Sequence, residues 1–242
     1  AFLHGILAAI LLRDEGGRLV YGDPARVRTE TLCDTLEDVR DAGASAAVRL
    51  LPEYADDLAS YEVAELEPIE IVALGRRVLT APTPSRGGRI VADILEMLSA
   101  ARDPSLHDEA RALQIAYGRS GAGPLTGTTH ISVVDASGTA AALSSTLGSG
   151  SGVFRQGAQL NNMLGELDVI GHEPRAPGTR LPTMLTPTLV LEDGRARLVL
   201  GSAGSVRLAG AIAQVAWRVL TGWPVGEAIG GPRIHVDGST LH

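Results

Sequence analysis

Residues 128–146 constrain the fold of this chain more than any other stretch, because they combine two strand patterns with a tight turn. Thr128–Asp135 is rich in β-branched residues, and Thr139–Thr146 follows after a turn that contains Gly138. Two such runs around a glycine-containing turn are typical of a β-hairpin. The sequence therefore predicts a hairpin whose first strand begins immediately after Gly127. On pattern alone this junction has an ordinary explanation, because glycine turns often lead into β-branched strands.

The elements expected around this hairpin are paired strands and helices. The pattern predicts helices over the first dozen residues and over residues 26–48, 53–61, 90–101, 107–117 and 206–220. It predicts strands over residues 68–80, 185–192, 195–201 and 232–236, with a turn at Asp193-Gly194. Strands paired by hairpins and followed by helices indicate an α+β layered fold. Residues 118–127 contain four glycines and are typical of an exposed loop, which suits a processing site.

Composition places the chain among globular proteins and excludes some partners. Of its 242 residues, 45% are hydrophobic and 20% are charged, which suffices for a buried core. The formal net charge is −7 and lysine is absent, so we expect no nucleic-acid surface, which needs clustered basic residues. The single cysteine, Cys33, cannot form an internal disulfide or a zinc cluster. We expect it to be a buried thiol in a protein without a cofactor or metal.

The sequence contains no pattern of a membrane-spanning helix or a signal peptide. The longest apolar run, Phe2–Leu12, is interrupted by His4 and Gly5 and is too short to cross a bilayer. The first residues show no Met and no basic region followed by a cleavage site. These observations favour a cytoplasmic location, unless an upstream region with a targeting signal is absent from this sequence.

The hairpin motif resembles the start of the small subunit of γ-glutamyltransferases (γ-glutamyltranspeptidases), which are N-terminal nucleophile hydrolases. The matching residues are Thr128–Asp135, Gly138 and Ser145–Leu147. Further segments resemble the family in the same order along the chain: Leu58–Val63, Pro82–Gly88, Leu160–Glu166, Pro182–Thr188 and Gly201–Ser205. The first two of these resemble the end of the family's large subunit. The resemblance therefore covers nearly the whole chain.

The resemblance implies a fold and a domain organisation. Members of the family have an αββα four-layer sandwich, in which two sheets pack between helical layers, and we expect that architecture here. Residues 1–127 would be the C-terminal part of a large-subunit-like region, and residues 128–242 a small-subunit-like region, together forming one domain. The early part of a typical large subunit has no counterpart in this sequence. We therefore expect a shortened or partial member whose fold is incomplete at the N-terminus.

By the same resemblance, Thr128 is the catalytic nucleophile, and Gly127–Thr128 is the bond that the protein cleaves in itself. A threonine hydroxyl is a poor nucleophile unless a base removes its proton. Cleavage would give Thr128 a free α-amino group with a pKa of about 7.7–8.0, which can act as that base near neutral pH. His130 lies on the same face of the predicted strand as Thr128. In the family, however, this histidine belongs to the strand motif and is not the base.

Three further positions correspond to catalytic residues of the family. Thr146 corresponds to a threonine whose hydroxyl binds the amino group of the nucleophile, although a β-branched strand residue is an equally simple explanation. Gly204 and Ser205 correspond to two adjacent glycines whose N–H groups form the oxyanion hole. Ser205 keeps its N–H, but its Cβ restricts the backbone.

The substrate-binding positions depart further from the family. Met163 and Glu166 correspond to the glutamine and aspartate that bind the γ-glutamyl amino group, and Met163 cannot accept a strong hydrogen bond. Thr183 and Met184 correspond to paired serines that bind the α-carboxylate, so one hydroxyl is retained. Gly148 replaces an asparagine. Because losing one buried polar partner costs about 1–3 kcal/mol, we expect weakened selectivity for glutamate.

These expectations lead to one principal hypothesis and two alternatives. In the principal one, the protein forms an acyl-enzyme and transfers a γ-glutamyl or related acyl group from a small-molecule amide, such as glutathione, to water or an amine. It would then be a heterodimer of processed subunits or a homo-oligomer. The first alternative is a catalytically inactive homologue that acts as a binding or assembly module. The second is a fragment that needs a separate chain to complete its fold.

Overall fold

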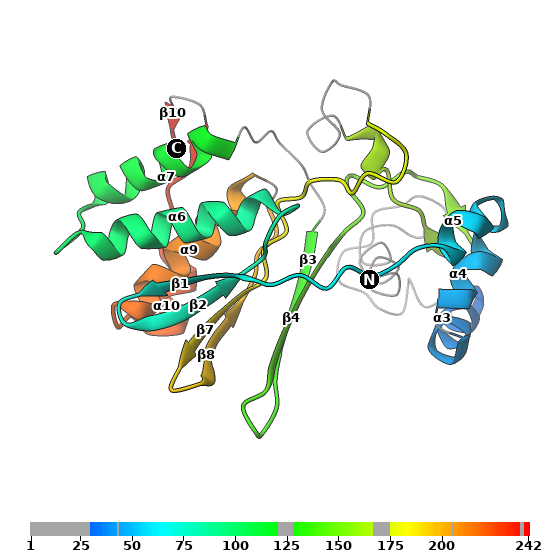
Figure 1. The fold of residues 1–242 in the computed structure, drawn as a ribbon, viewed down its shortest axis with the longest axis horizontal. Coiled ribbons are helices and arrows are strands. Elements are labelled where there is room, and N and C mark those ends of the chain that lie inside the picture. The colour runs from blue at the N-terminus through cyan, green and yellow to red at the C-terminus, as the bar shows by residue number, and fades with distance from the viewer. Residues whose placement is uncertain (1–29, 43, 121–127, 167–174, 205, 238–239) are drawn as a thin grey trace. The chain divides into compact units, whose positions relative to one another are not determined.

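The computed structural model describes residues 30–42, 44–120, 128–166, 175–204, 206–237 and 240–242 (Figure 1). These residues divide into two compact units, a smaller one from residues 30–65 and 145–166 and a larger one from the rest. The helix predicted over the first dozen residues lies outside the described residues, as do residues 121–127 of the loop predicted over 118–127. Residues 118–120 of that predicted loop belong to a helix instead, because the helix predicted over 107–117 continues to Ser120. None of the helices within the described ranges is long and apolar enough to cross a membrane.

The smaller unit is built around two helices, α3 (Glu30–Ala42) and α4 (Ala44–Leu50), where the sequence predicts one helix over 26–48. The remaining elements are η1 (Pro52–Tyr54), α5 (Ala55–Ala59), β5 (Phe154–Arg155), β6 (Ala158–Gln159) and η2 (Met163–Gly165). Its core contains Leu32, Val39, Ala46 and Ala158. Cys33 follows Leu32 on α3 and therefore points away from the core-facing stripe. It is partly exposed, so the prediction of a buried thiol was wrong.

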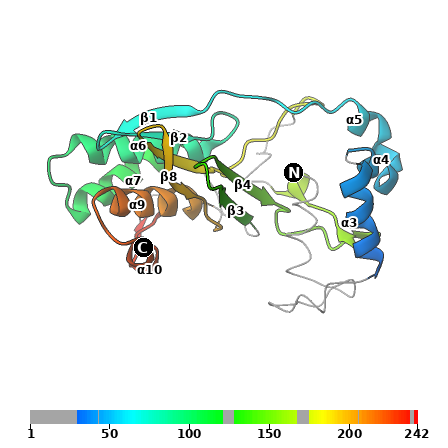
Figure 2. The same cartoon turned by 90° about the horizontal axis from the view of Figure 1, so that it is seen from below.

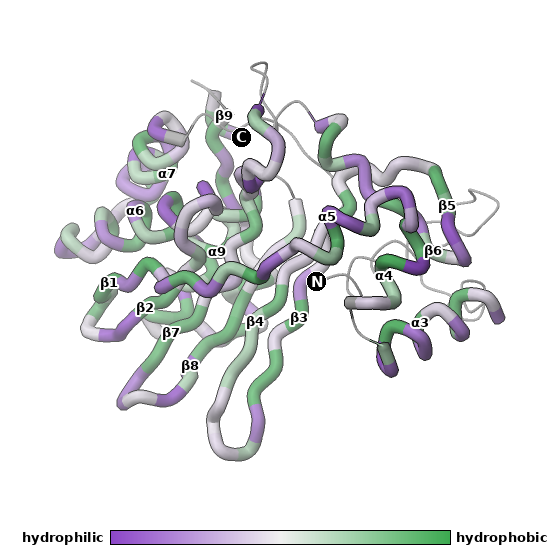
Figure 3. The backbone as a smooth tube through the Cα atoms, turned by 45° about the vertical axis from the view of Figure 1, so that its right-hand side comes forward, coloured by the Kyte–Doolittle hydropathy of each residue, from purple (hydrophilic) through white to green (hydrophobic). Residues whose placement is uncertain are grey.

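The larger unit contains a four-stranded antiparallel sheet in the order β1-β2-β7-β8. Its strands are β1 (Ile69–Ala73), β2 (Arg76–Thr80), β7 (Thr188–Glu192) and β8 (Arg195–Leu200). Alternate residues such as Ile71, Val78 and Val190 are buried and lie opposite one another across the sheet. The predicted turn at Asp193-Gly194 is confirmed, since both residues have positive φ, as a two-residue hairpin of this kind requires. Figure 3 shows hydrophobic residues along β7 and β8 and hydrophilic residues at their turn.

Three helices form the rest of the core of the larger unit. They are α6 (Arg86–Ala100), α7 (Leu106–Ser120) and α9 (Arg207–Leu220), followed by the short α10 (Val225–Gly230). Helix α6 packs against β1, β2, α7 and α9, and both views show it beside β1 and β2 (Figures 1 and 2). The sequence places the start of this helix at residue 90. It begins earlier because Ser85 caps it, accepting a hydrogen bond from the N–H of Gly88.

The predicted hairpin is confirmed and consists of β3 (Thr128–Val134) and β4 (Ala140–Thr146) (Figure 1). Gly138 has φ +88° in the turn, and Asp135 Oδ1 accepts hydrogen bonds from the N–H groups of Ser137 and Thr139. The hairpin is also attached to the sheet, because Ser132 Oγ donates to the carbonyl of Val199 over 3.1 Å. The elements of this unit therefore confirm the predicted α+β class.

The strand predicted over residues 232–236 is much shorter in the structure. Strand β9 covers Val236–Asp237 and pairs with β10 (Thr240–Leu241). The reason is the side-chain amide of Gln214 on α9. Its Nε2 donates to the carbonyl of Ile234 over 2.8 Å, and its Oε1 accepts from the N–H of Ile234 over 3.0 Å. A buried side chain thus takes the two backbone groups that a strand partner would use.

We expect Gly88→Ala to destabilise the protein, because an added Cβ would lie 1.7 Å from the carbonyl oxygen of Ala81. The overpacking should lower the free energy of unfolding by about 1–3 kcal/mol, measured by urea denaturation followed by circular dichroism. Gly118→Ala on α7 is the matched control, since its Cβ meets nothing within 4 Å. Alanine should stabilise that helix by about 0.5–1 kcal/mol. Equal stabilities for the two variants would contradict the close approach of α6 to residue 81.

Candidate active site

Thr128, the predicted nucleophile, is the first described residue of β3 and is half-buried. Gly127, the other half of the predicted cleavage site, lies outside the described residues. Two residues along the strand, His130 faces the same side as Thr128, as the strand alternation predicts. Because Thr128 is at the start of a strand, cleavage of the preceding bond would leave its free amino group at the end of a rigid element.

His130 connects β3 to the segment that leads to Gly204. Its Nδ1 lies 2.8 Å from Ser144 Oγ on β4, and its Nε2 lies 3.0 Å from Ser132 Oγ. The ring also occupies the space above Gly201, where an added Cβ would come within 2.1 Å of Nδ1. Because both ring nitrogens have hydroxyl partners, the arrangement suits a histidine that holds the strand in place. Gly201 can only be a glycine while this ring keeps its position.

The predicted oxyanion segment is fixed by its glycine and by α9. Gly204 has φ +122°, a conformation that side chains rarely adopt, and its carbonyl accepts a hydrogen bond from the N–H of Arg207 over 3.1 Å. Ser205 lies outside the described residues. Backbone N–H groups at the start of a helix are well suited to bind developing negative charge. The described part of this segment is a glycine with positive φ at the start of a helix, and its role in an oxyanion hole stays a prediction.

Tyr117 of α7 anchors the same segment, and sequence reasoning missed it. Its hydroxyl donates to the carbonyl of Val206 over 2.5 Å and accepts from the N–H of Gly210 over 2.9 Å. Burial disfavours the phenolate and raises the pKa of Tyr117 to about 12, although the Gly210 N–H opposes this effect. The phenol is therefore neutral at ordinary pH and keeps its donor. The available signal was its place as the last apolar residue of the helix predicted over 107–117.

Thr183 and Met184 lie in an extended segment beside the start of α6. Thr183 forms a parallel bridge with Ser85, since its N–H donates to the carbonyl of Pro84 and its carbonyl accepts from the N–H of Arg86. Thr183 Oγ1 accepts from the N–H of Leu185 over 3.0 Å. Met184 points the other way, into the hydrophobic core. Of these two predicted substrate-binding residues, only Thr183 is placed where its side chain is partly exposed.

Thr146, Met163 and Glu166 belong to the smaller unit. Thr146 ends β4, and its Oγ1 accepts from the N–H of Gly148 over 3.1 Å. Met163 begins η2 and is half-buried. The structure describes these three residues separately from Thr128, Gly204, Thr183 and Met184, which belong to the larger unit.

Glu166 closes a loop of polar contacts in the smaller unit. Its Oε1 accepts from the N–H of Ser149 over 2.8 Å and from Ser149 Oγ over 2.7 Å. Asn162 Nδ2 donates to Ser149 Oγ, and Asn162 Oδ1 accepts from the N–H of Gly150. Partial burial by itself raises the pKa of the Glu166 carboxyl, but the hydrogen bonds from Ser149 and Asn162 outweigh it and lower the pKa. The residue is therefore a carboxylate at neutral pH.

Gly148 fits tightly inside this loop. It has φ +65°, and a Cβ at this position would lie 2.3 Å from Asn162 Oδ1 and 2.8 Å from Glu166 Oε1. At the position where the resemblance predicts an asparagine, the glycine leaves room for the side chains of Asn162 and Glu166, which would have to shift to admit a Cβ.

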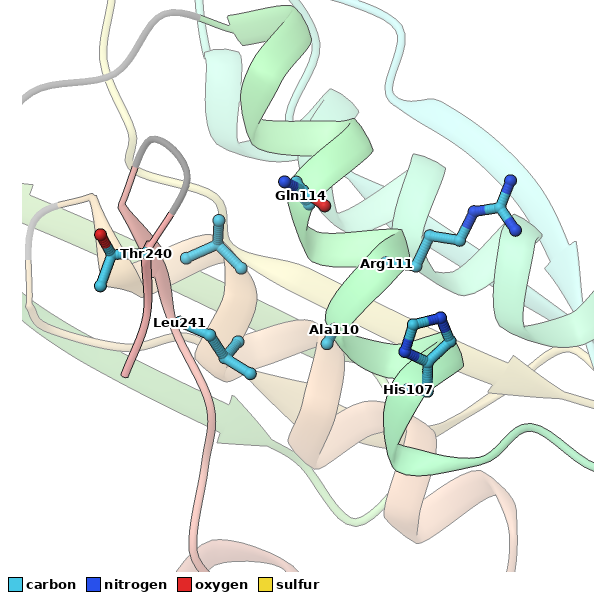
Figure 4. Close-up of a pocket in the computed structure, with 7 residues that line it drawn as sticks. His107, Ala110, Arg111, Gln114, Thr240 and Leu241 are labelled. Carbon is cyan, nitrogen blue, oxygen red and sulfur yellow. The ribbon is translucent and has the colours of Figure 1, made fainter.

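A cavity of about 350 Å³ lies between α7 and the β9–β10 hairpin (Figure 4). His107, Arg111 and Gln114 line it from α7, and Thr240 and Leu241 line it from the hairpin. Figure 4 shows the Arg111 side chain directed away from Leu241. None of the predicted site residues with a described position lines this cavity. Within the described part of the chain, no group of three or more His, Cys, Asp or Glu side chains could hold a metal ion.

Comparison with known proteins places these residues in context. The family model described as Gamma-glutamyltranspeptidase matches residues 107–240. Glutathione hydrolase 5 proenzyme of Mus musculus is 28% identical in an alignment that covers 84% of this chain and 46% of the mouse protein. Glutathione hydrolase proenzyme of Pseudomonas aeruginosa is 27% identical in an alignment that covers 74% of this chain and 44% of the bacterial protein. The chain spans about half the length of the curated relatives it matches.

A solved structure with a similar fold is cephalosporin acylase from Bacillus halodurans. The likeness has a TM-score of 0.69 at 17% sequence identity and covers 91% of this chain and 51% of the acylase. At this identity it concerns the fold alone. It confirms the predicted fold of the N-terminal nucleophile hydrolase type.

We expect Tyr117→Phe to destabilise the larger unit, because it leaves the part-buried carbonyl of Val206 and the buried N–H of Gly210 without their hydroxyl partner. The free energy of unfolding should fall by about 1–3 kcal/mol in urea denaturation. Tyr54→Phe, at an exposed tyrosine, is the control and should have little effect. If both variants unfold like the wild type, the anchoring role is wrong.

The stability difference between the wild type and Tyr117→Phe should also depend on pH. Because the pKa of Tyr117 is raised from 10.0 to about 12 on folding, its contribution to stability is full below pH 10 and is lost as the pH rises through 12. The stability difference between wild type and Tyr117→Phe should therefore shrink between these pH values.

Proposed function

Because the chain belongs to the γ-glutamyltranspeptidase family, we propose that it is an N-terminal threonine amidohydrolase or acyltransferase with Thr128 as its nucleophile. The observation that carries the proposal is the position of Thr128 at the start of β3, immediately after the glycine of the expected cleavage site. The mouse and Pseudomonas relatives are named as proenzymes, which agrees with an activity that appears after cleavage. In this proposal residues 128–242 form the small-subunit-like region.

The reaction proceeds in two stages. First, Thr128 Oγ1 attacks the carbonyl of Gly127, and the peptide C–N bond breaks as the hydroxyl proton passes to the nitrogen, which becomes the free α-amino group of Thr128. Water then hydrolyses the resulting ester, which restores the hydroxyl and separates the two parts of the chain. In the second stage this amine accepts the proton of Oγ1 as the oxygen attacks a substrate amide. The proton passes to the leaving amine, and an acyl-enzyme ester remains. Water or an acceptor amine then attacks the ester and restores the hydroxyl.

Stabilisation of the tetrahedral intermediate is the role that we assign to the N–H groups at Gly204 and Ser205. Removing a single donor of this kind costs other enzymes about 3–4 kcal/mol in the transition state. Tyr117 and His130 support the proposal indirectly, because they hold the two ends of the segment from Gly201 to Val206. Thr146 would bind the released amino group of Thr128.

The substrate is an amide of a γ-glutamyl or related acyl group, with glutathione as the family example. Three positions argue for weaker recognition of glutamate. Met184 is packed in the core, Met163 lacks a strong acceptor, and Glu166 already accepts two hydrogen bonds from Ser149. Related acyl amides are therefore credible substrates beside the γ-glutamyl compounds.

A catalytically inactive homologue that serves as a binding or assembly module is the second candidate. The burial of Met184 and the replacement of a family glycine by Ser205 favour it, since both remove parts of the expected site. Processing of the Gly127–Thr128 bond distinguishes the two candidates.

Denaturing mass spectrometry of the purified protein tests the cleavage. We expect the wild type to break at Gly127–Thr128, and Thr128→Ala to remain a single chain because it lacks the attacking hydroxyl. Thr129→Ala is the matched control, because it removes the neighbouring hydroxyl on the other face of the strand and should still cleave. A wild-type chain that stays intact, or a cleaved Thr128→Ala chain, would sink the proposal.

Hydrolysis of γ-glutamyl and other acyl anilides tests the substrate class. We expect Met163→Gln to raise kcat/KM for the γ-glutamyl compound by roughly one order of magnitude, because it restores a polar partner worth about 1–3 kcal/mol. Leu164→Gln, at an exposed neighbour, should leave it unchanged. A wild-type protein that hydrolyses γ-glutamyl anilide alone, with Met163→Gln having no effect, would refute the expected loss of selectivity.

A further inference from the structure

A pocket of about 540 Å³ in the larger unit is lined by five arginines, and we call it the arginine pocket. It lies where the start of α6, the end of α7 and the segment of residues 175–182 meet. The five residues come from all three places: Arg86, Arg89, Arg119, Arg175 and Arg180. Of the predicted catalytic and substrate-binding residues that the structure describes, none lines it.

The concentration of positive charge in the arginine pocket contrasts with the rest of the protein. The chain has a formal net charge of −7, and five of its 21 basic residues line this one pocket. Among the lining residues that the structure describes, Asp93 is the one that carries a carboxylate. A concave site with charge of one sign attracts small ions of the other sign, because its low-dielectric walls focus the field.

Asp93 organises two of the guanidinium groups. Its side chain is only 6% exposed, while those of Arg89 and Arg119 are 55% and 67% exposed. Arg89 Nε donates to Asp93 Oδ1 over 2.6 Å, and Arg119 Nη1 lies 3.4 Å from Asp93 Oδ2. Glu96 accepts a further hydrogen bond from Arg89 over 2.7 Å. A guanidinium carries five N–H donors, so groups oriented in this way keep donors for a ligand.

The walls of the pocket also define the size and character of the ligand. Ile90 and Ala116 contribute apolar surface between the arginines. The volume falls within the range of pockets that bind small organic molecules. Guanidinium groups bind carboxylates and phosphates through paired hydrogen bonds. We propose that the arginine pocket binds a small organic anion with two or more carboxylate or phosphate groups.

Isothermal titration calorimetry on the full-length Thr128→Ala protein tests this proposal without any dependence on catalysis. Citrate and glucose 6-phosphate are the two probes, and glucose is the neutral control, with ionic strength held constant by sodium chloride. We expect saturable binding of at least one anion, and the stronger one identifies carboxylate or phosphate as the preferred group. Absence of saturable binding by both anions, or equal binding of glucose, overturns the proposal.

Two double variants locate the binding. Arg175→Gln/Arg180→Gln removes two pocket arginines and should raise the Kd of the bound anion by roughly tenfold or more. Arg40→Gln/Arg77→Gln removes the same charge at exposed ion pairs outside the pocket and should change the Kd by less than about twofold. Equal weakening by the two variants would show that only net charge matters and would overturn the site.

Chemical modification gives an answer even if the pocket variant fails to fold. Phenylglyoxal modifies accessible arginines, and the modified positions are read by peptide mass spectrometry. This test uses the Thr128→Ala protein with all its pocket arginines in place. The bound anion should lower the extent of modification of Arg119, Arg175 and Arg180 at least about threefold, while Arg40 should react equally with and without the anion. Equal modification of the pocket arginines in both conditions would contradict the proposal.

Discussion

The close approach of the first turn of α6 to two backbone segments is the constraint on which the larger unit depends. Gly88 lies against the carbonyl of Ala81, and Gly87 lies against the carbonyl of Met184. Ser85 caps the helix and also donates to the carbonyl of Leu185 over 2.8 Å. Larger residues at 87 and 88 would separate the helix from both segments. The sheet, the segment with Thr183 and one wall of the arginine pocket therefore take their positions from two glycines and one serine.

The parts of the fold that depend on local pattern could be predicted from the sequence. Alternation and turn chemistry identify β3, β4, β7 and β8, because side chains and turns in a hairpin obey a period of two and a demand for positive φ. Contacts between distant residues could not be predicted in this way. The amide of Gln214 shortens the last strand, and the hydroxyl of Tyr117 anchors Val206 across 89 positions of sequence. No local pattern contains either contact.

The candidate site shows the same division. The motif identifies Thr128 at the start of a strand, and the structure places it there. The paired positions Thr183 and Met184 are adjacent in an extended segment, so their side chains point to opposite sides. Correspondence with a pair of serines therefore could not reveal that Met184 is part of the core. His130 and Tyr117 hold the segment around Gly204 before any ligand binds, and preorganisation of this kind is what makes backbone donors effective in catalysis.

The packing around Gly148 limits the order in which Gly148, Asn162 and Glu166 can be substituted. Asparagine tolerates positive φ better than most residues, so the backbone at +65° is not the obstacle to the family's residue. The obstacle is the space already filled by Asn162 and Glu166. A single substitution to asparagine would clash with both side chains, so the same substitution fits only after both neighbours have moved or been replaced. Residues 148, 162 and 166 are therefore coupled in evolution. Whether asparagine is tolerated at residue 148 depends on whether Asn162 and Glu166 have changed before it.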